Sequence, residues 1–193
     1  MSKSDPAASK RERNKTIRWV IIIFFITMLV SGTITFVSDE IMDHSNIVVA
    51  FLILLMIVLF GIIFDTVGVA VTSADEKPFH SMAARKVPGA MEAIRLLRNA
   101  ERVSSICNDV VGDICGVVSG SASATIAAQV LQNFDFSAPR IVTLLMSALV
   151  AGLTVSGKAI GKTLAINSST KIVSVVGRII YTLRGIPLLF KKK

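Results

Sequence analysis

Five polar residues lie within stretches of this sequence that are otherwise apolar enough to cross a membrane: Asp65, Asn108, Asp109, Asp113 and Lys158. An ionisable side chain in hydrocarbon costs at least ~2.5–3.5 kcal/mol, so such residues are rare there and usually line ion paths or pair internally. Carboxylate and amide oxygens are the ligands that hard cations such as Mg²⁺ prefer. Because these residues belong to three different apolar stretches, they predict a polar site inside a small helical bundle.

Two interpretations of this site are open. In the first, oxygen ligands for a cation pathway come from Asp65, Thr66, Asn108, Asp109 and Asp113. In the second, Lys158 pairs with Asp65 or Asp109 in a structural network, or extends its ammonium to the membrane interface. Three carboxylates against one lysine leave a surplus negative charge, which either holds a cation or is removed by protonation.

Four apolar stretches are long enough to span a bilayer, and they cover residues 17–37, 47–71, 103–131 and 141–160. The chain has 193 residues, of which 52% are hydrophobic, and a mean hydropathy of +0.68, values typical of a membrane protein. The first stretch is too long for the apolar region of a signal peptide, so we interpret it as a retained anchor. The predicted fold class is an all-α integral membrane protein with four transmembrane helices.

The basic residues alternate between the connections and predict the topology. Six lie between Lys3 and Arg18, none lies in residues 38–46, and six lie in residues 72–102. By the positive-inside rule, this is a multi-pass protein of the cell membrane with both termini in the cytoplasm. The net charge of +8 is then explained by an anionic inner leaflet and does not require a nucleic-acid partner. Residues 1–16 form a cytoplasmic tail, which we expect to be disordered to about Asn14.

The rise per residue of an α-helix gives the expected depth of three of the polar residues in the membrane. It places Asp65 about 10 Å and Asn108 about 8 Å from the cytoplasmic ends of their spans. Lys158 falls near the end of the last span, within several ångströms of the cytoplasmic edge. The three side chains are therefore expected at one level of the inner leaflet.

Two segments lie outside the predicted spans. Residues 73–102 have the pattern of a cytoplasmic juxtamembrane helical hairpin, broken at Val87-Pro88-Gly89. Residues 171–193 contain a C-terminal amphipathic helix, expected to lie on the inner leaflet, followed by a basic tail. A fifth span is disfavoured because it would bury both Arg178 and Arg184.

Little in the sequence indicates an enzyme. His44 and His80 lie in connections on opposite sides of the predicted membrane, and we find neither a nucleophile–base arrangement nor a phosphate-binding glycine loop. On a helix, Cys107 and Cys115 are about 12 Å apart, beyond disulfide reach, and we interpret them as small packing residues. We therefore expect neither catalysis nor a nucleotide site in this chain.

Three segments resemble the transmembrane domain of the CorB/CorC/CNNM magnesium-transporter family. Gly89–Arg102 resembles the stretch that ends the family's basic hairpin, and Ser105–Asp109 resembles its asparagine motif. Gly157–Ala165 resembles the motif of the last family span. The segments occur in the family's order, so residues 47–170 are similar to a CorC-like domain and residues 17–37 are an added anchor.

The resemblance implies a homodimer that carries Mg²⁺, with Asn108 in the place of the family's magnesium-coordinating asparagine. Asp65 and Thr66 are the nearest oxygen donors in the first family span. Lys158, between Gly157 and Lys162, stands where the family has a glutamate, and the family's paired cytoplasmic nucleotide-binding (CBS) domains are absent from this chain. The resemblance thus predicts a divalent-cation transporter or a diverged relative. The alternative is a non-transporting membrane scaffold or regulatory protein whose buried acids are neutralised by Lys158.

Overall fold

The computed structural model describes residues 6–133 and 139–190, in which all regular secondary structure is helical. The helix that includes Ile106–Gly112 widens there into a π-helical segment, η1. The helices are α1 (Pro6–Asp43), α2 (Ile47–Ser73), α3 (Lys77–Ala84), α4 (Ala90–Arg98), α5 (Ala100–Ser105), α6 (Asp113–Asn133), α7 (Pro139–Asn167) and α8 (Ser169–Phe190).

Four helical stretches are apolar and long enough to cross a membrane, which confirms the predicted number of spans. They are Ile17–Met42, Ile47–Ser73, Ala100–Asn133 and Pro139–Asn167. The last of them continues well beyond the predicted end at residue 160. Helix α1 begins at Pro6, so the expectation of a disordered tail is wrong for residues 6–14; residues 1–5 lie outside the described residues.

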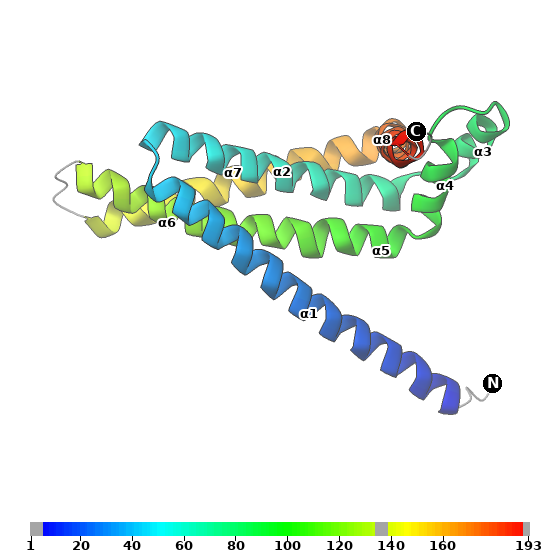
Figure 1. The fold of residues 1–193 in the computed structure, drawn as a ribbon, viewed down its shortest axis with the longest axis horizontal. Coiled ribbons are helices and arrows are strands. Elements are labelled where there is room, and N and C mark those ends of the chain that lie inside the picture. The colour runs from blue at the N-terminus through cyan, green and yellow to red at the C-terminus, as the bar shows by residue number, and fades with distance from the viewer. Residues whose placement is uncertain (1–5, 134–138, 191–193) are drawn as a thin grey trace.

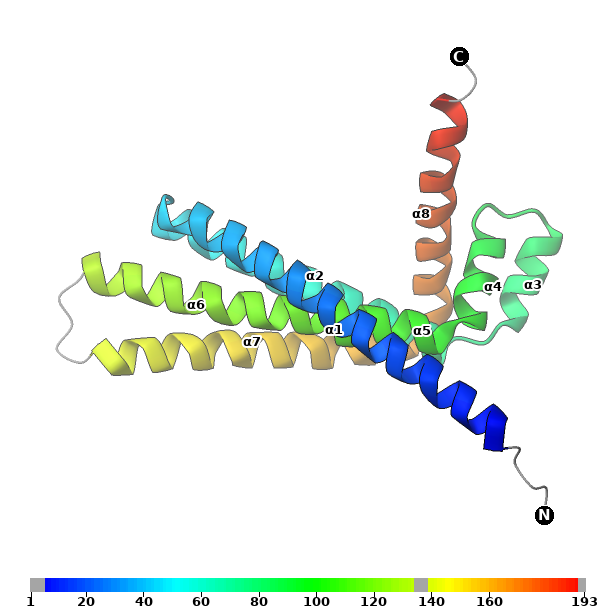
Figure 2. The same cartoon turned by 60° about the horizontal axis from the view of Figure 1, so that its bottom comes forward.

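Helix α2 is the centre of the bundle, because it packs on α6, α7, α8, α5 and η1. It begins after Asn46, whose side-chain oxygen accepts a hydrogen bond from the Val48 amide at 3.4 Å. Figures 1 and 2 show α2, α6 and α7 running lengthwise together, while α1 crosses them obliquely and leaves the bundle toward its N-terminus.

Helix α1 is attached to α6 near the α1–α2 turn. Asp39 accepts a hydrogen bond from Ser121 Oγ at 3.0 Å, and the Gln129 amide donates to the Met42 carbonyl at 2.6 Å. The Met42 side chain is fully buried there, in an apolar cluster with Leu54 and Ile126. These contacts anchor α1 to the bundle near the α1–α2 turn.

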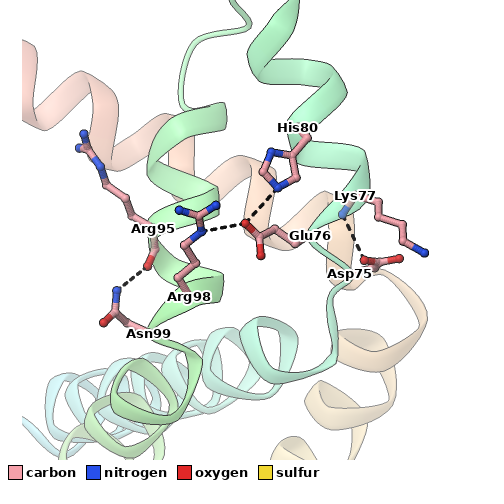
Figure 3. A network of polar contacts seen from close by, with 7 residues as sticks. All are labelled: Asp75, Glu76, Lys77, His80, Arg95, Arg98 and Asn99. Carbon is pink, nitrogen blue, oxygen red and sulfur yellow. Dashed lines mark hydrogen bonds and ion pairs between the residues drawn. The ribbon is translucent and has the colours of Figure 1, made fainter.

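The opposite end of the bundle, here termed the hairpin end, gathers α3, α4 and α8 (Figure 2). Fully buried Phe79 of α3 packs there with Ala93, Ile94 and Val173. Glu76 ties the two short helices together, because its Oε1 is 2.9 Å from Arg98 Nε and 3.0 Å from His80 Nε2 (Figure 3). These contacts make α3 and α4 one unit at the base of α2.

Helix α8 runs across the bundle axis at the hairpin end (Figure 2). It meets α4 through glycine backbone: a Cβ at Gly177 would lie 2.6 Å from the Gly89 carbonyl oxygen. Val173 is buried beneath α4, whereas Val175, Ile179 and Leu183 are exposed. A helix in this position with an exposed apolar face is suited to the membrane surface, and that placement stays a prediction.

Candidate functional site: a buried ion pair between the spans

Asp65 and Lys158 form an ion pair between α2 and α7. Lys158 Nζ lies 3.8 Å from Asp65 Oδ1, and the side chains are 24% and 7% exposed respectively. Of the two partners considered from the sequence, the lysine therefore pairs with Asp65 and not with Asp109. Because its ammonium is held there, Lys158 does not extend to the end of the bundle.

Lys158 lies farther from the end of its helix than expected, because α7 is longer than expected. Lys158 precedes the end of α7 at Asn167 by nine residues, which is about 13 Å of helix. Asp65 precedes the end of α2 at Ser73 by about 12 Å, and Asn108 follows the start of the α5 stretch at Ala100 by a similar rise. The three polar residues thus share one level, as the sequence predicted, but farther from the hairpin end.

The backbone of η1 forms one wall of the ion pair. A Cβ at Gly112 would lie 3.4 Å from Lys158 Nζ and 3.7 Å from Asp65 Oδ1, which is ordinary van der Waals contact. Gly112 is buried, and a larger side chain at this position would displace the ammonium. A methyl group would therefore fit at residue 112, and the small size of this residue leaves space for the pair between three helices.

Asn108 lies on η1 against Gly68 of α2. A Cβ at Gly68 would overlap the Asn108 amide, so glycine is required for this approach. The amide nitrogen donates to Ser104 Oγ at 3.1 Å, whereas Oδ1 is buried without a hydrogen-bond partner among the described residues. Asp65 Oδ2 is likewise buried without a hydrogen-bond partner among the described residues. A π-helical turn at such a position is frequent at functional sites.

Thr66 turns toward α7 instead of toward Asn108. Its Oγ1 donates to the Ile62 carbonyl at 2.7 Å and lies against Gly161, where a Cβ would overlap it. Gly157 similarly accommodates the Ile62 side chain. Residues 157 and 161 are thus the packing contacts through which α7 approaches α2 and carries Lys158 to Asp65.

The structure places Asp109 and Asp113 away from the ion pair, on the exposed side of η1 and α6. Asp109 Oδ2 accepts a hydrogen bond from Ser105 Oγ at 2.8 Å, one helical turn away. Lys162, one turn beyond Lys158, is also exposed. The expected set of oxygen ligands is therefore reduced to Asp65 and Asn108 at this site.

The electrostatic balance of the site follows from this placement. One carboxylate and one ammonium cancel, so the surplus negative charge expected from the sequence is not present at the pair. Within the described residues, no three His, Cys, Asp or Glu side chains are grouped closely enough to hold a metal ion. The positive charge at this site comes from the lysine ammonium, and no free cation is needed to balance the Asp65 carboxylate.

Gly68 and Gly112 both lie against the site, and of these two glycines only Gly68 was not predicted from the sequence. Each lies three or four residues after a polar residue that was recognised, Asp65 and Asn108, and such spacing places both on one helix face. This spacing is the feature of the sequence that could have indicated glycine contacts at the site.

Comparisons with models of protein families, with curated proteins and with solved structures found no match.

Proposed function

We propose that the protein is a diverged relative of the CorC-like divalent-cation transporters that works as a non-transporting membrane scaffold or regulatory partner. The observation that carries this proposal is the 3.8 Å contact between Lys158 Nζ and Asp65 Oδ1 beside Asn108. The motif resemblance supports the relationship, and the ion pair supports a loss of transport.

Charge explains why a lysine here opposes a divalent ion. At about 4 Å and an effective dielectric constant of about 20, a divalent cation interacts with a unit charge by about 8 kcal/mol. The attraction of Asp65 is therefore offset by repulsion from Lys158. Nothing then compensates for removing water from Mg²⁺, which gives up its hydration reluctantly.

The exposed side of η1 and α6 supports a role in assembly. Asp109 and Asp113 lie there, and a Cβ at Gly116 or Gly120 would meet no atom within 4 Å. Each carboxylate left facing hydrocarbon would cost ~2.5–3.5 kcal/mol, and small residues permit close approach of another helix. A second copy, as the resemblance implies, or a different membrane protein would cover this face.

We expect the double variant Asp109→Asn/Asp113→Asn to dissociate from its partner, because the amides lose the charged contacts that the partner supplies. Blue native electrophoresis of mildly solubilised membranes measures this as a loss of the larger species. Asp75→Asn, an exposed acid at the α2–α3 connection, is the matched control and should leave the species unchanged. An unchanged size together with a raised melting temperature for the double variant would show that this face meets lipid instead.

Lys158→Glu is expected to create a divalent-cation site. Two carboxylates and the Asn108 amide would then face one another without a positive charge, and Mg²⁺ at millimolar concentration should raise the melting temperature of this variant. Adding Asn108→Ala to Lys158→Glu should abolish the increase, while Lys162→Glu, at an exposed position, should show none. A Lys158→Glu protein that folds but melts at the same temperature with and without Mg²⁺ would contradict the proposal.

The second candidate function is divalent-cation transport, and two buried oxygens favour it. Asp65 Oδ2 and Asn108 Oδ1 have no hydrogen-bond partner among the described residues, so both are free to accept a ligand. In this candidate, Lys158 moves aside during transport. Mg²⁺-dependent stabilisation of the wild-type protein, abolished by Asn108→Ala, would favour this second candidate.

A further inference from the structure

A groove at the hairpin end separates α4 and α5 from α8. Its volume is about 260 Å³. It is lined on one side by Arg95, Leu96, Asn99 and Val103 together with Glu92, and on the other by Ile180 and Arg184. The groove is formed by helices that are far apart in the sequence, and the contact of Gly89 with Gly177 holds them together.

The groove presents arginine from both of its sides. Arg184 belongs to α8, whose sequence from Ser169 to Phe190 contains no acidic residue. Arg95 is directed away from Glu76, which is already bonded to Arg98 (Figure 3). Among the described residues that line the groove, Glu92 is the one acid, and its carboxylate lies 3.6 Å from Arg95. Two guanidinium groups against one carboxylate leave a net positive charge, and guanidinium binds phosphate in a bidentate manner.

The other half of the groove is apolar. Leu96, Val103 and Ile180 are half-buried in its lining, and Val103 lies near the start of the Ala100–Asn133 stretch that is apolar enough to span a membrane. Helix α8 lies across the ends of the spans at the same level (Figure 2). A membrane crossed by the Ala100–Asn133 stretch would place these arginines at the depth of its lipid headgroups, with the apolar side chains beside the acyl region.

We propose that this groove binds an anionic phospholipid, with the phosphate between Arg95 and Arg184 and an acyl chain along Val103 and Ile180. A soluble phosphate ester would use the same arginines but would gain nothing from the apolar half. This inference does not depend on whether the chain transports ions, because the groove lies at the base of the bundle and not at the Asp65–Lys158 pair.

The test is native mass spectrometry of the full-length protein with phosphatidylglycerol or phosphatidylcholine of the same acyl chains. We expect retention of phosphatidylglycerol over phosphatidylcholine by wild type, and a loss of about fivefold for each arginine replaced in Arg95→Gln and Arg184→Gln. The matched control is Lys77→Gln/Arg85→Gln, which removes the same charge from exposed residues of the α3 region, outside the groove. Melting curves establish that each variant is folded.

Three results would overturn the proposal. Equal retention of the two lipids would show that the groove does not select for a negatively charged headgroup. A loss in the control as large as in Arg95→Gln/Arg184→Gln would assign the effect to overall charge and not to the groove. Displacement of the lipid by millimolar glycerol 3-phosphate would show that the arginines take a soluble phosphate ester and that the apolar half contributes no affinity.

Discussion

Lys158→Met is expected to lower the free energy of unfolding by about 3–5 kcal/mol, because it leaves the Asp65 carboxylate buried without a counter-charge. Adding Asp65→Asn to Lys158→Met should recover most of this loss, since a neutral pair of similar volume carries no uncompensated charge. The measurement is reversible unfolding, or the melting temperature, of the purified protein in bicelles.

Lys162→Met is the control for that experiment. Lys162 lies one turn farther along α7 and is exposed, so its replacement should change stability little. If Lys158→Met were as mild as Lys162→Met, the ammonium would not be held by Asp65 and the site would have to be described without the ion pair.

Gly89→Ala is expected to lower stability by about 2–4 kcal/mol and to loosen α4 from α8. Gly89 has a φ of +86°, a region that side-chain-bearing residues rarely adopt. Its Cβ would in addition lie 2.5 Å from the Arg178 amide nitrogen, which is backbone and cannot rotate away. Hydrogen–deuterium exchange should show faster exchange in both helices, alongside a lower melting temperature.

The matched control is Gly152→Ala in the middle of α7. A Cβ at Gly152 would meet no atom within 4 Å, and alanine is favoured over glycine inside a helix by about 1 kcal/mol. Gly152→Ala should therefore leave stability unchanged or slightly raised. Unaltered exchange in α4 and α8 after Gly89→Ala would mean that the two helices are not held by this backbone contact.

The number of spans was predictable because each consists of an apolar run of sufficient length, a property that needs no tertiary information. The end of the last span was not predictable in the same way. The apolar stretch was predicted to end at residue 160, yet α7 continues to Asn167, and Gly161 and Ala165 are buried in the packing of this end. Likewise, charged residues after Pro6 suggested a tail, but proline at the first position is compatible with a helix start.

The level of the polar site was predictable, and its composition was not. Helical rise alone places Asp65, Asn108 and Lys158 at one depth. Which of Asn108 and Asp109 faces α2 depends on the rotation of the helix, since consecutive residues of an α-helix differ by about 100° around its axis and the π-helical segment η1 changes that rotation. Both faces of this helical segment carry polar residues, so the periodicity of the sequence did not show which face packs on α2. Packing of the Asn108 amide on Gly68 decides the rotation.

If the Lys158 ammonium takes the place of a transported cation, the protein carries no Mg²⁺ across a membrane, and Mg²⁺ flux into liposomes measures this. Wild-type protein, reconstituted around a Mg²⁺-sensitive dye, is expected to give the same flux as protein-free liposomes. Saturable Mg²⁺ entry that requires Asn108 would contradict the claim and would establish the chain as a transporter in which the lysine moves aside.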